Sequence, residues 1–256
     1  MAYETLTLTI ERDVATITLT RPETRNALSR TLRRELLAAI AAATATARVL
    51  VLTGAGQAFC SGQDLGDAGP DIDFEATLRD EYLPLLRAIY DCPIPTLAAV
   101  NGPAAGAGAN LALACDLVIA ARSASFLQAF ARIGLIPDAG GSCWLPRQIG
   151  FARAMGAVLL AEPVGAEEAA AWGMIWQAVP DADFAATVAA RARQLAEGPT
   201  EAYRLARKAL RQGLENDLES QLALEAALQA SAGATADFRE GVAAFLEKRP
   251  ARYEGR

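Results

Sequence analysis

The fold of this chain is decided by the stretch Asn101-Gly-Pro-Ala-Ala-Gly-Ala-Gly-Ala-Asn110, which runs directly into the apolar segment 111–114. A second glycine-rich turn follows at Ile136-Pro-Asp-Ala-Gly-Gly141. Glycines packed this closely let backbone N–H groups approach a ligand, because no Cβ stands in the way. A helix that begins just after such a turn leaves its first N–H groups without intrahelical partners, near the positive end of the helix dipole. The two turns therefore predict a place where an anion is held.

A single carboxylate, Asp138, lies within these two turns. The chain contains no histidine, which excludes Ser–His–Asp and Cys–His catalysis and removes the commonest metal ligand. Its four cysteines show no metal-ligand spacing, so we expect no metal site. Carboxylates are then the main proton carriers at neutral pH, and Asp138 is the candidate. The alternative is an ordinary turn residue, since Pro-Asp-x-Gly is also common turn chemistry.

Composition favours an enzyme with a large buried core. The chain has 256 residues, of which 52% are hydrophobic and 21% are charged, enough for one or two domains. A net charge of -6 argues against a nucleic-acid surface, which needs a basic footprint. The first twenty residues alternate and carry charges, unlike a signal peptide, and no apolar run reaches membrane-spanning length. We therefore expect a cytoplasmic protein with neither a nucleic-acid partner nor a membrane partner.

Residue periodicity predicts an α/β core. Alternation over 5–10 and 14–20 predicts a hairpin, and Ser29 is expected to cap a helix that extends to about residue 46. Further elements are strands at 48–53, 94–100, 116–121 and 175–179, with helices over 74–90 and 107–114. Strands separated by helices predict a parallel sheet joined by right-handed crossovers.

The last part of the chain is almost wholly helical and rich in alanine. We expect an α/β core over residues 1–196 and a C-terminal helical module over 197–256, with no Gly/Ser linker between them. The terminal helices are expected to pack on the core or on a neighbouring subunit.

Five motifs follow one another along the chain: Arg21-Pro-Glu-Thr-Arg-Asn-Ala-Leu28, Ala58-Phe-Cys-Ser-Gly-Gln-Asp-Leu65, 101–108, 136–141 and Phe245-Leu-Glu-Lys-Arg249. In this order they resemble the crotonase superfamily, also called the enoyl-CoA hydratase/isomerase family. The segments 59–65, 105–109, 134–141 and Trp172-Gly-Met-Ile-Trp-Gln177 resemble most closely the ring 1,2-epoxyphenylacetyl-CoA isomerases of that family.

The resemblance implies a crotonase-like fold, in which a spiral of ββα and βαβ turns is followed by C-terminal helices that drive trimerisation. A homotrimer or a dimer of trimers is the implied assembly. The implied substrate is an acyl-CoA thioester, with no separate cofactor, because coenzyme A enters with the substrate. By the same resemblance, the backbone N–H groups of Gln63 and Ala107 form an oxyanion hole, and Asp138 matches the catalytic aspartate. Each aimed donor contributes on the order of 3 kcal/mol in such a site.

The resemblance also implies a larger set of residues that bind the substrate or its coenzyme A: Arg25, Ala27, Ser61, Gly62, Asp64, Leu65, Gly106, Asn110, Phe130, Phe245 and Lys248. Three of these have a simpler alternative. Phe245 and Lys248 resemble tail residues that reach a neighbouring subunit's coenzyme A, but they also fit an ordinary amphipathic terminal helix. Arg25 either contacts a phosphate or is merely solvated.

Two departures from the family pattern bear on the reaction. Hydratases of the family place two glutamates across the substrate, and the matching positions here hold Asn110 and Phe130. Neither side chain is a base, and Phe130 would expel water. Asn110 either orients a substrate oxygen or a water, or only packs. Hydration is therefore not the activity that this pattern favours.

The mechanism left after hydration is a proton shift by one carboxylate, Asp138. This group takes a proton from one carbon and returns it to another carbon two bonds away. The apolar side chains Phe130, Ile133, Leu135 and Ile136 are expected to raise the pKa of Asp138 by desolvation. The resemblance implies a cofactor-independent isomerase of 2-(1,2-epoxy-1,2-dihydrophenyl)acetyl-CoA in phenylacetate degradation. Two alternatives stay open: a general Δ3,Δ2-enoyl-CoA isomerase or hydratase-like enzyme of fatty-acid oxidation, and a non-catalytic subunit that binds acyl-CoA.

Overall fold

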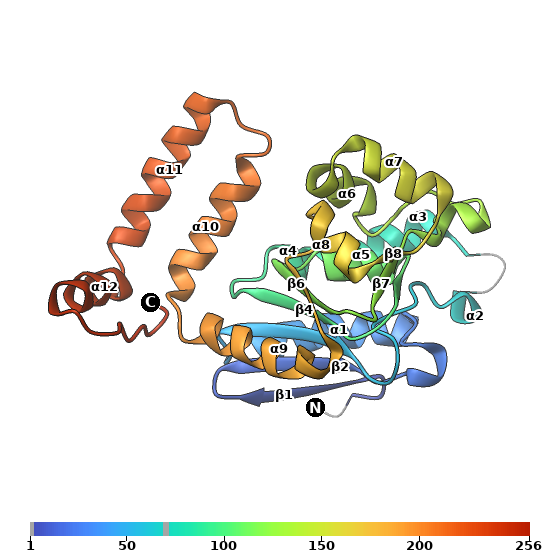
Figure 1. The fold of residues 1–256 in the computed structure, drawn as a ribbon, viewed down its shortest axis with the longest axis horizontal. Coiled ribbons are helices and arrows are strands. Elements are labelled where there is room, and N and C mark those ends of the chain that lie inside the picture. Colours follow the sequence, from blue (N-terminus) through green and yellow to red (C-terminus); the bar gives the residue numbers. More distant parts are fainter. Residues whose placement is uncertain (1–2, 69–71) are drawn as a thin grey trace.

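A computed structural model describes residues 3–68 and 72–256 of the chain (Figure 1). Within these residues, the main sheet has six strands in the order β1-β2-β3-β4-β6-β9. Their bounds are β1 (Leu6–Glu11), β2 (Val14–Leu19), β3 (Val49–Gly54), β4 (Thr96–Val100), β6 (Leu117–Ala121) and β9 (Gln177–Val179). Strands β1 and β2 are antiparallel, and every later neighbour pair in this order is parallel. The predicted hairpin and parallel sheet are both confirmed.

The first crossover shows why the sequence folds as expected. Helix α1 (Arg30–Thr44) connects β2 to β3, and the Ser29 hydroxyl accepts the N–H of Leu32 at 3.2 Å. This bond satisfies one of the unpaired donors at the start of the helix. The buried face of α1 packs against the sheet through Leu32, Leu36 and Ile40, at the spacing of successive helical turns.

A second, smaller sheet was not expected from the sequence. It joins β5 (Ala104–Ala105), β7 (Ser125–Leu127) and β8 (Val164–Gly165) within the described residues. Two isolated parallel bridges, Leu28 with Gln63 and Cys60 with Ala104, lie beyond the ends of the main strands. Strands of two or three residues are too short to show the alternation of polar and apolar residues by which a strand is predicted. The pairing of Cys60 with Ala104 brings the 58–65 motif beside the first glycine-rich turn.

The helix expected over 74–90 is unbroken along the chain but changes its hydrogen bonding within that range. It comprises α3 (Phe74–Thr77), a π-helical turn η2 (Leu78–Tyr82) and α4 (Leu83–Tyr90). The N–H of Leu83 donates to the Leu78 carbonyl five residues back. Pro84 follows and has no N–H for an ordinary helical bond, and its ring would crowd the carbonyl four residues earlier. The wider turn accommodates the proline.

The remaining elements of the core surround the two sheets. They are α2 (Leu65–Ala68), α5 (Ala107–Leu113), α6 (Gly141–Ile149), α7 (Phe151–Leu160), α8 (Ala166–Trp172), α9 (Asp181–Ala196) and the 3-10 turns η1 (Pro22–Thr24) and η3 (Ala129–Ile133). Helix α9 packs on one face of the sheet, where Phe184 and Val188 contact a buried cluster that includes Val51, Leu97 and Ile119. The larger cluster fills the other face, beneath α1, α4 and α5.

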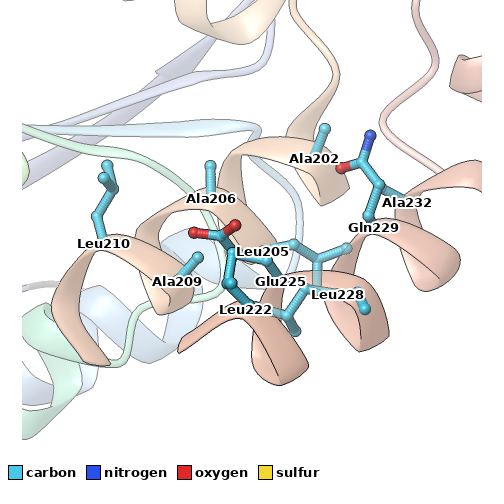
Figure 2. A pocket seen from close by; sticks show the side chains of 11 residues that line it. Ala202, Leu205, Ala206, Ala209, Leu210, Leu222, Glu225, Leu228, Gln229 and Ala232 are labelled. Atoms are coloured by element: carbon cyan, nitrogen blue, oxygen red, sulfur yellow. The ribbon is translucent and has the colours of Figure 1, made fainter. Parts of the chain in front are cut away.

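Helices α10 (Thr200–Gln212), α11 (Leu218–Gly233) and α12 (Ala236–Glu247) project from the core as an arm (Figure 1). Helix α9 ends at Ala196, and the division of the chain into a core over 1–196 and a C-terminal module over 197–256 stays a prediction. Within the described residues, no side chain of α11 is buried. Between α10 and α11 lies a groove of about 730 Å³, along which Ala206 and Leu222 are seen in Figure 2.

Arginines connect this arm to the core. Arg207 and Arg211 of α10 both donate to one oxygen of Asp116, at 2.6 and 2.8 Å. The other oxygen of Asp116 accepts the N–H of Thr96 at the start of β4. Arg211 also lies over the ring of Tyr90, 3.8 Å from its centroid. The arm is therefore joined to the core through an ion-pair cluster on α10.

Candidate active site

A cavity of about 250 Å³ opens beside the two glycine-rich motifs. Its wall is made by residues from four segments: 61–65, 72–82, 106–107 and 129–138. Most of these side chains are apolar, including Phe74 and Leu78 from the α3–η2 segment and Phe130 from η3. Among the described lining residues, Asp138 is the one carboxylate. The cavity thus combines an apolar wall with one group that can exchange a proton.

Asp138 is held in place through its backbone. Its carbonyl accepts the N–H of Gly141 and an amide N–H of Asn110, both at 2.8 Å. Within the described residues, the buried Oδ1 has no hydrogen-bond partner. Burial disfavours the charged form and raises the pKa of Asp138 to about 6, against a smaller lowering by a backbone hydrogen bond. Such a carboxylate is ionised at neutral pH but ready to take up a proton.

The two predicted oxyanion-hole residues, Gln63 and Ala107, both line this cavity. The segments that carry them are joined by the N–H of Ala105, which donates to the Cys60 carbonyl at 2.9 Å. Gly62 makes the close approach workable, because a Cβ there would lie 2.8 Å from the Ala105 carbonyl oxygen and 3.4 Å from the Ala107 nitrogen. Ala107 is the first residue of α5, where a helix leaves its N–H groups without internal partners.

Asn110 lies behind Asp138, within the part of the chain that the structure describes, and its side chain is fully buried. While its Nδ2 donates to the Asp138 carbonyl, its Oδ1 accepts the amide of Gln128 at 3.0 Å. A Cβ at Gly141 would lie 2.3 Å from the Asn110 side-chain nitrogen, so the glycine is what lets this loop close onto α5. These contacts fit the packing alternative for Asn110.

The apolar side chains expected around Asp138 line the cavity, with one exception. Phe130, Ile133 and Leu135 line the cavity, and Phe130 is buried. Its ring reaches the turn of Gly106, where an added Cβ would contact the ring at 3.7 Å. Ile136, however, is 80% exposed, so its expected part in desolvating Asp138 is wrong. The turn before Pro137 directs that side chain away from the cavity.

The predicted binding residues of the 21–28 and 58–65 motifs gather at one edge of the cavity. Ser61 donates its hydroxyl to the Thr24 carbonyl at 3.0 Å, and its N–H donates to the carbonyl of Arg25. Asp64 pairs with Arg21 at 2.8 Å, and the same Arg21 nitrogen donates to the carbonyl of Ala27. The side chain of Arg25 is exposed beside this edge, and so is Leu65 at the start of α2. These contacts order this edge of the cavity.

Phe245 and Lys248 stand apart from all the others. They lie at the end of α12 and just after it, and Phe245 is 81% exposed. Neither residue lines the cavity of the same chain. Their expected contact with a neighbouring subunit's coenzyme A stays a prediction.

Sequence reasoning missed a polar network behind Gln63. The hydroxyl of Tyr82 donates to Gln63 Oε1, and Arg33 Nη1 donates to the same oxygen at 3.0 Å. Arg33 also pairs with Glu81 through two nitrogens. One signal was available: Arg33 is followed at helical spacing by Leu36 and Ile40, which places it on the buried face of α1.

No group of three or more metal-ligating side chains occurs in the part of the chain that the structure describes. In the same residues, every helix is too short or too polar to cross a bilayer.

Comparison with known proteins identifies the family to which this chain belongs. Residues 9–256 match the sequence profile of the enoyl-CoA hydratase/isomerase family. The chain therefore belongs to this family, the crotonases, and is an enzyme with hydratase or isomerase activity on acyl-CoA thioesters. The expected crotonase fold is confirmed.

Individual members of the family are similar to this chain over nearly its whole length. The chain is 61% identical over 257 residues to a protein of Rhodobacter capsulatus named "Probable enoyl-CoA hydratase", with 100% of both chains covered. It is 46% identical to the 1,2-epoxyphenylacetyl-CoA isomerase of Escherichia coli, over 96% of this chain and 97% of the relative. The crystal structure of an enoyl-CoA hydratase from Bacillus anthracis matches with a TM-score of 0.92 at 33% identity, covering 99% of this chain and 100% of that one.

Proposed function

We propose that this enzyme is a cofactor-independent acyl-CoA isomerase in which Asp138 carries a proton between two carbons of the substrate. The observation that carries the proposal is the buried Asp138 carboxyl, which lines an apolar cavity of about 250 Å³ together with Gln63 and Ala107. A base with a pKa of about 6 is ionised at neutral pH and still accepts a proton readily.

For a β,γ-unsaturated thioester, the carboxylate of Asp138 first takes a proton from the α-carbon. The electron pair left behind moves onto the thioester oxygen, where the N–H groups of Gln63 and Ala107 stabilise the negative charge. The protonated Asp138 then returns the proton to the γ-carbon, and the electron pair moves back to form the α,β double bond. Atoms and electrons balance in this 1,3-shift without water or a second reactant.

We infer that the acyl group is a phenylacetyl ring carrying a 1,2-epoxide. Two observations support this substrate. The isomerase of Escherichia coli that shares 46% of its residues with this chain carries that activity in its name. The cavity is bounded by the aromatic side chains Phe74, Tyr82 and Phe130, which suit the flat faces of a six-membered ring. A general Δ3,Δ2-enoyl-CoA isomerase would use the same residues on a linear chain.

Hydration is the second candidate function, because the relative at 61% identity is named a hydratase. Adding water across a double bond needs groups that activate the water and protonate carbon. The two positions where the family's hydratases carry glutamates hold the buried Asn110 and Phe130 here. With Asp138 as the one carboxylate among the described lining residues, isomerisation has the better support.

Turnover by the purified enzyme separates these functions. Three thioesters are compared: the ring epoxide of phenylacetyl-CoA, trans-3-hexenoyl-CoA as the linear isomerase substrate, and crotonyl-CoA as the hydratase substrate. We expect the ring epoxide to react fastest and crotonyl-CoA slowest. Asp138→Asn is expected to lower isomerisation by about 10²- to 10⁴-fold, as for loss of a general base, while thioester binding is kept. Faster hydration of crotonyl-CoA than either isomerisation would overturn the proposal, and so would retained turnover in Asp138→Asn.

We further propose that the subunits form a homotrimer or a dimer of trimers through the arm. The support is a set of large apolar side chains left exposed on it: Leu210, Leu214, Leu218, Leu222, Phe238, Val242, Phe245 and Leu246. Exposed apolar surface of this extent is typical of an interface. In such an assembly Phe245 and Lys248 would lie against a neighbour's coenzyme A.

A further inference from the structure

A buried guanidinium lies directly behind one end of the proposed oxyanion hole. We infer that Arg33 is a positioning residue, which fixes the backbone donor at Gln63 and ties it to the helical segment that covers the acyl group. This inference rests on the proposed role of the Gln63 N–H. It assigns to Arg33 no contact with the substrate.

One nitrogen of Arg33 holds both sides of the pairing that contains Gln63. The side chain is 3% exposed, and its Nη1 donates to the Leu28 carbonyl and to Gln63 Oε1. Leu28 and Gln63 form an isolated parallel bridge, in which the N–H of Leu28 donates to the Gly62 carbonyl at 2.8 Å. The peptide that supplies the oxyanion donor is therefore fixed by a bridge on its backbone and by Arg33 on its side chain.

The rest of the same guanidinium reaches the wall of the cavity. Nε and Nη2 of Arg33 donate to Glu81, and the guanidinium lies 4.9 Å from the centroid of the Tyr82 ring. The Tyr82 hydroxyl completes the network by donating to Gln63 Oε1. Glu81 and Tyr82 end the π-helical turn η2, and Leu78 at its start lines the cavity.

This connection predicts a dependence of the chemistry on the cavity wall. An acyl group that packs against Leu78 and Tyr82 presses on the same segment that holds Arg33 and Gln63. A displacement of about 1 Å of a positioned group can cost about 100-fold in rate. Loss of Arg33 should therefore lower kcat, whereas binding through the coenzyme A portion of the substrate should be kept.

The chain offers a matched control on the same helix. Arg30 lies three residues before Arg33, has a side chain that is 76% exposed, and pairs with Glu81 Oε1 at 2.9 Å. Arg33→Lys keeps a positive charge near Glu81 but loses the fork that reaches Leu28 and Gln63 together. We expect Arg33→Lys to lower kcat about 10- to 100-fold with KM changed by less than about threefold. Arg30→Lys should stay within about twofold of the wild-type rate, because exposed ion pairs contribute little.

A spectroscopic readout separates positioning from a loss of folded protein. Cinnamoyl-CoA has a conjugated carbonyl, so its absorption band moves to longer wavelength when hydrogen-bond donors polarise the thioester oxygen. We expect a clear shift on binding to the wild type and to Arg30→Lys, and a smaller shift at saturation with Arg33→Lys. Tyr82→Phe keeps the ring and removes one hydrogen bond, so its shift should be intermediate even if Arg33→Lys folds poorly. The double variant should show less than the sum of the two losses.

The outcomes distinguish this inference from the proposed function. If the cinnamoyl-CoA band shifts more on binding to the wild type than on binding to Arg33→Lys, the inference stands even when the enzyme turns out to hydrate rather than isomerise. Equal band shifts and equal kcat values in Arg33→Lys and Arg30→Lys would overturn it. It would also fall if the wild type gave no band shift, or if Tyr82→Phe matched the wild type in both measurements.

Discussion

The cavity region and the arm are built on opposite principles. Behind the cavity, polar side chains such as Arg33 and Asn110 are buried, and each is hydrogen-bonded to a loop that carries a site residue. On the arm, apolar side chains such as Leu218 and Phe245 are left in solvent. Buried polar groups that are fully paired fix one geometry, whereas exposed apolar groups need a cover. The cavity is thus assembled within one chain, whereas the arm carries the apolar surface through which we propose that subunits associate.

Because of this contrast, variants in the two regions should change different measured properties. Changes behind the cavity should alter the rate and leave the assembly intact. Changes on the arm should alter the assembly and leave the geometry around Asp138 intact. Four experiments test this contrast between the cavity region and the arm.

The largest effect is expected from Asn110→Ala. The variant removes one of the two 2.8 Å donors to the Asp138 carbonyl and leaves Gln128 without its acceptor. We expect kcat to fall about 100-fold and the free energy of unfolding to fall by about 2 to 3 kcal/mol. Steady-state kinetics and urea unfolding measure the two effects, with light scattering to verify that the assembly mass is unchanged. A near-normal rate would show that the loop keeps Asp138 in place without Asn110.

Leu218→Glu tests the arm. Leu218 is the first residue of α11 and 75% exposed, and an acidic residue suits the first turn of a helix. If a neighbour covers this position, burying a charge there should weaken association about 10- to 100-fold, since a buried Leu contributes about 1.5 to 3 kcal/mol. The control is Glu219→Gln at the next position. Sedimentation over a range of concentrations gives the result, and an unchanged dissociation constant would place the interface elsewhere.

The pH dependence of kcat/KM tests the base. The raised pKa of Asp138, about 6, means that the reactive carboxylate is lost as the pH falls through this value. We expect kcat/KM to drop about tenfold per pH unit below pH 6 and to level off above it. The arm variant Glu219→Gln should show the same profile. A profile that stays flat to pH 4.5 would contradict Asp138 as the base.

The smallest effect concerns stability. The pKa of Asp138 is raised from 3.8 to about 6 in the folded state, so the ionised carboxylate opposes folding above pH 6 by up to about 3 kcal/mol. An asparagine there still needs hydrogen-bond partners, so Asp138→Asn should gain only about 1 kcal/mol at pH 8. The gain should shrink towards pH 4, where the wild-type side chain is protonated. Thermal unfolding at both pH values measures this, and a destabilised variant at pH 8 would contradict it.

Much of the main sheet could be predicted from the sequence. The hairpin, α1 and the strands at 49–54, 96–100 and 117–121 follow from alternation, a Ser29 cap and runs of apolar residues, which are local signals. The small second sheet could not be predicted, because pairs such as Ala104–Ala105 have almost no period of their own. The π-helical turn was also missed, although Pro84 marks the place where the ordinary bonding must change.

The candidate site likewise has a part that could be predicted from the sequence and a part that could not. The glycine-rich turns and Asp138 are contiguous motifs, so their place beside one cavity could be anticipated. Arg33 and Tyr82 lie far from those motifs in the sequence and reach Gln63 only through the packing of α1 against η2. Ile136 was misplaced for a related reason, because the period of a glycine-rich turn does not tell which side chains face inward.

Helix α5 has a consequence for how such an enzyme could change its substrate. Ala107 begins this helix and Asn110 holds the Asp138 loop from three residues further on, about 4.5 Å along the axis. The separation between the proposed proton carrier, Asp138, and the proposed oxyanion donor at Ala107 therefore depends on the rise of a helix, which hardly varies with side-chain identity. Substitutions at 72–77 or 129–135, outside the segment that contacts Arg33 and Gln63, can reshape the space for the acyl group while that separation persists. We expect new specificities to arise there by single substitutions that leave the proposed proton transfer intact.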